Sequence, residues 1–383
     1  MSRYRWTILA LGTAGQASYS AVFLGIPVLA PQLGDEYGLT LTELGVVLAA
    51  VSIGSVVTLL PWGLLTDRLG ERGVLAAGLA GASAALVVAA SAEGFLLLVA
   101  MLVLAGAAGA SVNAASGRAV LGWFGPSERG FALGIRQTAL PLGGAAAALA
   151  LPPIAAAGGT RAGLLVLAGA CLATAVAGAV GLREATAGDG ERLGDVVNPL
   201  RDARMWRLAA GSGLIVCAQI SIMAFAVLFL HGVRGVSAAW AAGVFAAMQL
   251  LGAGLRIAVG RWSDRVGARI APLLKLACAL AAALAVSAAL TEAPLALFVP
   301  AFLVAGALSQ SWNGLSFTAT AELAGRSRAG AALGFQQTAL AVASGIAPPV
   351  FALLVEASSW GVAFGLAALL PLAGAGLVRR VPA

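Results

Sequence analysis

Two arginines lie inside long apolar stretches of the sequence, where a permanent positive charge needs a reason. They are Arg136 and Arg256, and the second lies four residues before Gly260. An ionisable side chain at membrane depth is costly unless it is paired or hydrated. A guanidinium presents a planar fork of N–H donors that matches a carboxylate, and it does not lose its proton. The two positions therefore indicate binding of an anion within an apolar protein.

No acidic residue balances these charges within the apolar stretches. All 16 Asp and Glu residues fall in polar connections or near the ends of apolar stretches. A carrier of cations usually needs a buried carboxylate as counter-charge, and the sequence offers none. Two guanidiniums that face each other repel, so an anion between them is the expected third partner. The balance of charges favours an anionic ligand.

Structural roles for the two arginines remain open at this stage. Arg256 could extend its charge to the membrane surface or bind carbonyl groups at the end of a helix. Arg136 could bond to the backbone or to Gln137 and brace two helices.

Neutral polar and aromatic residues in the same stretches would complete a binding site. Gln16 and Tyr19 are three residues apart and share a helix face, and Gln249 shares a face with Arg256. The other candidates are Trp312, Asn313 and Gln336. Each alone is more typical of a hydrogen bond between helices than of ligand contact.

The chain that carries these residues is too apolar to be a water-soluble protein. Charged residues are 10 % of its 383 residues and hydrophobic residues are 60 %, whereas a soluble domain carries about 25 % charge. The sequence has no catalytic triad, P-loop or dinucleotide fingerprint, and its single histidine and three cysteines lack metal-ligand spacing. We expect a lipid-embedded protein that is not an enzyme and needs no metal or cofactor. Its basic residues form no run that would suit nucleic acid.

Apolar segments long enough to cross a bilayer recur along the whole chain. A spanning helix needs about 20 mostly apolar residues, and unbroken runs without alternation favour helices over a barrel. The first segment is too long for a cleaved signal peptide, so we expect it to be retained. The twelve predicted spans are 6–30, 42–65, 74–92, 95–121, 131–156, 161–182, 206–231, 239–262, 270–290, 295–320, 330–356 and 360–378.

Basic residues predict the orientation of these spans. Of the 23 Lys and Arg residues, only Arg161 and Arg234 fall outside when both termini are placed in the cytoplasm. Arg118, Arg136 and Arg256 lie within spans, and all the others are cytoplasmic. This bias predicts cytoplasmic termini.

Short motifs repeat about 200 residues apart and divide the chain into halves. Residues 63–70 (GLLTDRLG) return as 260–267 (GRWSDRVG), and residues 132–140 (ALGIRQTAL) return as 332–340 (ALGFQQTAL). Gln16-Ala-Ser18 also returns as Gln219-Ile-Ser221. We predict two six-helix bundles, residues 1–182 and 206–383, joined by a cytoplasmic linker, residues 183–205. Arg136 in the first half stands where Gln336 stands in the second.

These motifs resemble the signatures of the major facilitator superfamily, and the resemblance covers the whole chain. The family's Gly-x-x-x-Asp-Arg-x-Gly turn lies between its second and third helices and is echoed between the eighth and ninth; both copies are present here. Glu71 departs from the pattern, because a basic residue is common there. The resemblance implies an all-α integral membrane protein with twelve transmembrane helices in two pseudo-symmetric six-helix bundles. It also implies a substrate site near mid-membrane and halves that rock to expose it alternately.

The charged turns of the two motif copies are candidates for a conformational latch. Asp67 and Arg68 lie in the first turn, and Asp264 and Arg265 in the second. Ion pairs there can hold one conformation and break in the other, although they could equally anchor the turns. Arg118 lies near the end of its span, where Asp67 and Glu71 are its expected partners.

An arginine at the offset of Arg256 from the second turn resembles the family's porters of monocarboxylates, oxalate and nitrate, where it contacts the anion. In that fold the helix of Arg136 is expected to lie beside the helix of Arg256. We predict a monomeric secondary transporter that moves a small organic anion, a carboxylate, across a bacterial-type plasma (inner) membrane by alternating access.

The coupling and one alternative function stay open. Protons could be carried on the substrate or through Glu322, Glu356 or His231, and anion uniport and exchange against a counter-anion are equally possible. The alternative is an exporter of neutral or amphiphilic compounds, as in drug efflux, with structural arginines. A receptor that transports nothing is disfavoured, because the sequence contains no soluble sensory domain.

Overall fold

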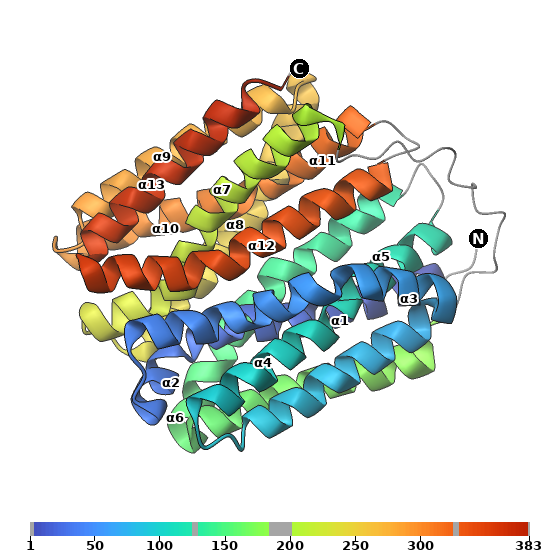
Figure 1. Cartoon of the computed structure of the whole chain (residues 1–383), viewed down its shortest axis with the longest axis horizontal. Coiled ribbons are helices and arrows are strands. Elements are labelled where there is room, and N and C mark those ends of the chain that lie inside the picture. The colour runs from blue at the N-terminus through green and yellow to red at the C-terminus, as the bar shows by residue number, and fades with distance from the viewer. Residues whose placement is uncertain (1–3, 125–128, 184–200, 325–328, 382–383) are drawn as a thin grey trace. The chain divides into compact units, whose positions relative to one another are not determined.

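The computed structural model describes residues 4–124, 129–183, 201–324 and 329–381, and within them the chain is helical without any strand (Figure 1). The helices are α1 (Tyr4–Val28), α2 (Ala30–Tyr37), α3 (Leu41–Ala89), α4 (Phe95–Gly109), α5 (Ser111–Trp123), α6 (Arg129–Gly181), α7 (Ala203–Leu228), the π-helical turn η2 (Phe229–Val233), α8 (Ala238–Val266), α9 (Ile270–Ala289), α10 (Leu295–Ser311), α11 (Asn313–Ala324), α12 (Ala329–Ala357) and α13 (Trp360–Val378). The predicted all-α class is confirmed.

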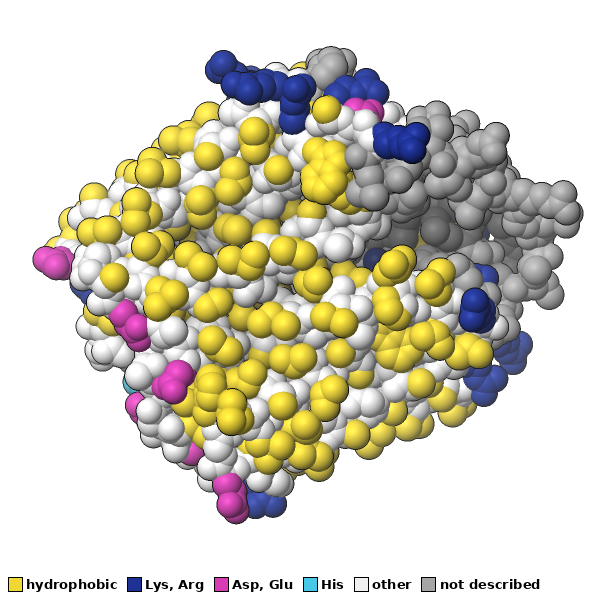
Figure 2. Space-filling model, viewed as in Figure 1, with side chains coloured by type: hydrophobic (Ala, Val, Ile, Leu, Met, Phe, Trp, Pro, Cys, Tyr) yellow, Lys and Arg dark blue, Asp and Glu magenta, His cyan; other side chains and the backbone are white. Residues whose placement is uncertain are grey.

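Eleven stretches of the described residues are long and apolar enough to cross a membrane. One of them, Gly134–Gly181, has 48 residues and is broken at Gly158 and Gly159, so it is long enough for two crossings. Counting its two parts separately gives the twelve predicted spans. Hydrophobic side chains cover the flanks of the helices in Figure 2, and charged side chains gather at the helix ends.

Backbone geometry shows that the two motif copies are structural repeats. Gly70 and Gly267, the last residues of the two Asp-Arg turns, have φ angles of 78° and 67°. Glycine adopts this left-handed region without the steric penalty of a Cβ atom. Each copy therefore has a glycine with a positive φ angle at the end of its turn.

Carboxylate side chains accept hydrogen bonds at the N-termini of two helical segments in the first half. At the start of α3, Thr40 Oγ1 accepts a hydrogen bond from the Glu43 N–H at 3.2 Å, and the Glu43 carboxylate accepts one from the Thr40 N–H at 2.9 Å. After the break in α6, the N–H and Oγ1 of Thr160 donate to Glu36 Oε2 at 3.3 and 2.5 Å. Glu36 belongs to α2, a short helix that the sequence did not predict.

The described helices form two compact units. The first unit comprises residues 1–190 and 227–246, and the second comprises 191–226 and 247–383. The predicted bundle boundaries at 182 and 206 stay a prediction.

Each unit has its own helix packing. In the first unit α1 packs on α5 and α6, and α3 packs on α4, α5 and α6. In the second unit α9 packs on α10 and α13, and α12 packs on α11 and α13. The contact of α3 with α6 in the first unit corresponds to the contact of α9 with α13 in the second unit. A repeated architecture requires such equivalent contacts.

Helices α3 and α4 approach so closely that their contact needs glycine. A Cβ atom at Gly106 would clash with the carbonyl oxygen of Val51, and one at Gly54 would clash with the carbonyl oxygen of Val103. We expect Gly106→Ala to lower the thermal unfolding temperature in detergent, because backbone cannot move aside as a side chain can. Gly169→Ala is the matched control, since open space surrounds that position. Alanine is favoured over glycine by about 1 kcal/mol within a helix, so without a clash both variants should melt at or above the temperature of the wild type. That result would contradict this account.

Candidate functional site

Arg136 is held by neutral acceptors within the first unit. Its side chain is buried, with 8 % of the residue exposed. Nε donates to Ser116 Oγ at 2.7 Å, and Nη2 donates to Gln16 Oε1 at 2.9 Å and to the Asn113 carbonyl at 3.1 Å. Among the residues that the structure describes, Nη1 has no partner and no carboxylate pairs with the guanidinium. Arg136 thus braces α1, α5 and α6 while its charge stays unneutralised by these residues.

The second unit repeats this brace without the charge. Gln336 Nε2 donates to Ser316 Oγ at 2.7 Å, and that hydroxyl shares a 2.6 Å hydrogen bond with Ser212 Oγ. Gln336 and Ser316 occupy the positions of Arg136 and Ser116 in the sequence repeat. An amide therefore suffices to join these helices, so bracing alone does not explain the guanidinium of Arg136.

Arg256 binds a single carbonyl with one edge of its guanidinium. Its Nε and Nη2 both donate to the backbone carbonyl oxygen of Gln310, at 3.0 and 2.9 Å. No carboxylate pairs with it in the described part of the chain, so the edge formed by Nη1 and Nη2 remains available. That edge presents two parallel donors, the geometry that a carboxylate accepts.

Arg256 lies within α8, ten residues before the last residue of the helix, Val266. Its bond to the backbone of Gln310 is the contact that a structural role would require. The Nη1 and Nη2 edge, which has no carboxylate partner among the described residues, is what ligand binding would require.

A chain of side-chain amides gathers most of the other predicted residues of the second unit. Trp312 Nε1 and Asn313 Nδ2 donate to Gln219 Oε1 at 3.0 and 3.4 Å. Gln219 Nε2 donates to Gln310 Oε1 at 2.6 Å, and Gln310 Nε2 donates to Gln249 Oε1. Sequence reasoning did not include Gln219 or Gln310 in the site. The repeat of Gln16 as Gln219 was the available signal for the first, and an amide inside an apolar stretch was the signal for the second.

Tyr19 and Gln16 contact different neighbours although they share a helix. Gln16 binds Arg136, whereas the Tyr19 hydroxyl bonds to Ser55 Oγ and donates to the Gly106 carbonyl at 3.3 Å. Tyr19 thus links α1 to α3 and α4, as hydrogen bonds between membrane helices commonly do. Its contact with substrate stays a prediction.

The first charged turn contains the ion pair expected for Arg118. Arg118 Nε lies 3.0 Å from Glu71 Oε1, with 45 % and 11 % of the side chains exposed. This pair joins α5 to the turn within α3. Arg68 is exposed at the same turn, and the side chain of Asp67 lies outside the described part of the structure.

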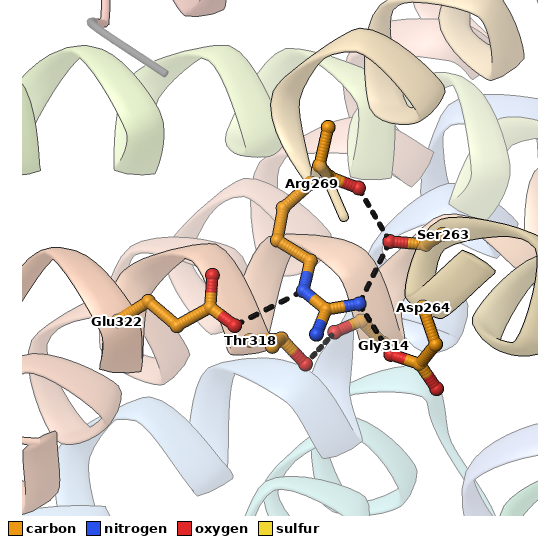
Figure 3. A network of polar contacts seen from close by, with 7 residues as sticks. Ser263, Asp264, Arg269, Gly314, Thr318 and Glu322 are labelled. Atoms are coloured by element: carbon orange, nitrogen blue, oxygen red, sulfur yellow. Dashed lines mark hydrogen bonds and ion pairs between the residues drawn. The ribbon is translucent and has the colours of Figure 1, made fainter. Parts of the chain in front are cut away.

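In the second turn, Asp264 pairs with Arg269 rather than with the adjacent Arg265 (Figure 3). Arg269 Nη1 lies 2.6 Å from Asp264 Oδ1 and donates to Ser263 Oγ at 2.9 Å, and its Nε lies 3.0 Å from Glu322 Oε1. Burial opposes the charge of Arg269, but the hydrogen bonds and charges of the two carboxylates outweigh it and raise its pKa. Arg265 is exposed. Arg269 was missed because it lies just beyond the Asp-Arg motif.

Each turn forms an ion pair with a neighbouring helix, but the acidic and basic partners are exchanged between the two units. In the first unit the turn supplies Glu71 and the helix supplies Arg118. In the second unit the turn supplies Arg269 and the helix supplies Glu322. Each unit therefore ties its charged turn to the helix that carries the Ser116 or Ser316 brace.

Comparisons of the sequence with known proteins agree on one family. The Major Facilitator Superfamily matches residues 11–348. An uncharacterised MFS-type transporter of Mycobacterium tuberculosis is 37 % identical over 379 residues, which are 98 % of this chain and 84 % of that protein. A hexuronate transporter of Bacillus subtilis is 28 % identical over 120 residues, which are 31 % of this chain and 28 % of that protein.

Solved structures share the fold at low sequence identity. A bacterial homologue of the human lysosomal transporter Spinster, in an inward-facing and occupied conformation, aligns with a TM-score of 0.85 and 15 % identity over 100 % of this chain and 97 % of that one. A D-xylose–proton symporter aligns with a TM-score of 0.81 and 15 % identity over 99 % and 98 % of the two chains. At this identity the likeness concerns the fold alone.

Proposed function

The chain belongs to the Major Facilitator Superfamily of transporters, and from that membership we propose that it is a secondary transporter of a small organic anion, a carboxylate. It is a multi-pass membrane protein of a bacterial type, and its family consists of transporters rather than enzymes. In this proposal it works by alternating access as a monomer in the inner membrane, with both termini in the cytoplasm.

One observation carries the proposal: the Nη1/Nη2 edge of Arg256 has no partner among the described residues, while the adjacent Nε/Nη2 edge is fixed. The Gln310 carbonyl takes both Nε and Nη2, which orients the plane of the group. A fixed guanidinium loses less freedom when it binds a carboxylate, so it discriminates by geometry as well as by charge. No carboxylate among the described residues competes for that edge.

Arg136 supports the same proposal from the first unit. Its Nη1 keeps two N–H donors without partners among the described residues, and Gln16 and Ser116 hold its other donors. We propose that Arg136 binds an anionic group through these donors, as Arg256 does in the second unit. The partial relative that is named a hexuronate transporter gives further support, since a hexuronate is a sugar carboxylate.

A thermal-shift screen of the purified protein tests the proposed substrate class. Lactate, succinate, glucuronate and nitrate are titrated beside neutral xylose, at constant ionic strength. A ligand that binds the folded state raises the melting temperature with the logarithm of its concentration. Stabilisation by at least one carboxylate supports the proposal, and stabilisation by xylose alone contradicts it.

We propose that the ion pairs at the two charged turns act as a conformational latch. The first is Glu71 with Arg118, and the second is Arg269 with Asp264 and Glu322. We expect Glu71→Arg and Arg118→Glu each to reduce initial uptake into proteoliposomes by about fivefold, and the two together to restore most of it. The restoration follows because the exchanged charges can form the same bond in reverse. A double variant as slow as the slower single variant would show that the pair is not a latch.

An exporter of neutral or amphiphilic compounds is the competing function. It is favoured by the three hydrogen bonds of Arg136 to neutral groups, which would suffice for a structural arginine. It predicts that replacement of either arginine leaves the choice of substrate unchanged.

A further inference from the structure

The amide chain of the second unit has a fixed direction. An indole N–H can only donate, so Trp312 requires the oxygen of Gln219 to face it at 3.0 Å. The Gln219 nitrogen must then face the oxygen of Gln310, and the Gln310 nitrogen must face the oxygen of Gln249. Orientations of amide groups are assigned from such networks. A single donor-only group therefore sets the direction of three glutamines.

This chain ends in a buried donor that lacks an acceptor. Gln249 is fully buried, and its Nε2 has no hydrogen-bond partner among the described residues. Rotation of the Gln249 amide would not remove the problem, because its nitrogen would then face the nitrogen of Gln310. A buried N–H without an acceptor is unfavourable, so a position that retains one is a candidate for contact with a ligand.

The unpaired donor lies on the same helix face as the available edge of Arg256. The two residues are seven positions apart in α8, which is two helical turns, or about 10 Å between their backbones. Both side chains reach Gln310: Arg256 binds its carbonyl oxygen, and Gln249 binds its side-chain amide. Gln310 therefore bridges the two side chains that carry the remaining donors.

We propose that the transported anion carries a second hydrogen-bond acceptor several atoms from its carboxylate, and that Gln249 Nε2 donates to it. The second acceptor is a hydroxyl, a keto oxygen or another carboxylate. This inference rests on the proposed function, because it assigns the first carboxylate to Arg256. Since Gln249 is buried, the substrate reaches it only in a state of the transport cycle that uncovers this face of α8. Trp312 acts as a positioning residue, because its N–H keeps Gln249 in the donating orientation.

Matched pairs of carboxylates test the inference by calorimetric titration of the purified full-length protein. Glutarate is compared with pentanoate, and adipate with hexanoate, because the members of each pair have equal chain lengths and differ in the second acceptor. We expect the wild type to bind the dicarboxylate of at least one pair about tenfold more tightly. Gln249→Met should reduce this ratio to near one by weakening the binding of the dicarboxylate. Trp312→Phe should also reduce the ratio, since it removes the N–H that orients the chain.

Gln137→Met is the matched control, because Gln137 is exposed in the first unit, and it should keep the wild-type ratio. A wild type that prefers neither dicarboxylate, or variants of both Gln249 and Trp312 that keep the preference, would overturn the inference and leave the proposed function standing. A wild type that binds no carboxylate would overturn both. If Gln249→Met does not fold, the ratio measured with Trp312→Phe decides.

Discussion

Replacement of Arg256 by lysine is expected to lower kcat/KM for carboxylate uptake by about a hundredfold. Lysine keeps the positive charge, but its ammonium group cannot hold the Gln310 carbonyl with one edge and a carboxylate with the other. Hydrogen bonds to charged groups contribute about 1.5 to 3 kcal/mol each, and about 2.8 kcal/mol corresponds to a hundredfold change in rate. Initial rates of radiolabelled uptake into proteoliposomes measure the effect.

Two comparisons make the Arg256→Lys result specific. Arg261→Lys changes an exposed arginine of the same helix and should leave uptake unchanged. Arg256→Gln removes the charge as well and should reduce kcat/KM further than lysine does. Uptake by Arg256→Lys within twofold of the wild type would show that the fork geometry is unimportant.

Arg136→Gln is expected to reduce carboxylate uptake by more than tenfold while the protein stays folded. The second unit already contains this substitution, since Gln336 makes the hydrogen bond to Ser316 that Arg136 makes to Ser116. The brace should therefore survive, and only the charge and the Nη1 donors should be lost. Uptake rates and the melting temperature measured on the same preparation separate the two effects.

Arg136→Leu provides the contrast. Leucine leaves the buried Ser116 and Gln16 without their partner, so the melting temperature should fall along with transport. If Arg136→Gln transports carboxylates as well as the wild type, Arg136 is a brace alone, and the asymmetry between Arg136 and Gln336 carries no information about the substrate.

Helical spans were predictable because they depend on local composition. Each span requires only about 20 apolar residues in sequence, and the structure reproduces the predicted segments. The break at Gly158 and Gly159 had also been anticipated as the end of one span and the start of the next, although the capping of Thr160 by Glu36 had not. That contact joins residues 124 positions apart, and nothing local in the sequence indicates it.

Hydrogen-bond partners inside the bundle were harder to predict. Nothing local in the sequence indicates that Gln219 and Gln310 meet, and only the hydrogen bond between their side chains in the folded structure shows it. The pairing of Arg118 with Glu71 was predictable, since both lie at the same predicted end of neighbouring helices. The pairing of Asp264 with Arg269 was not, because the motif drew attention to Arg265.

Because the two halves are repeats, a residue in one half can be compared with its counterpart in the other. Matching positions share a role when both copies make the same bond, as Ser116 and Ser316 do. Positions that differ, such as Arg136 and Gln336, mark a requirement of one half only. The charge of Arg136, which the equivalent bond in the second half does not need, is the basis on which we propose a partner from outside the protein.

Uptake of acids and of their matched neutral analogues tests the central claim most directly. Proteoliposomes containing the wild type or Arg256→Lys are supplied with radiolabelled lactate or lactamide, succinate or succinamide, and glucuronate or glucose. We predict that the wild type accumulates at least one acid well above empty liposomes, that it excludes the neutral partner of that acid, and that Arg256→Lys loses this uptake. Equal uptake of an acid and its neutral partner, unaffected by the Arg256 substitution, would contradict the assignment of this protein as a carboxylate transporter.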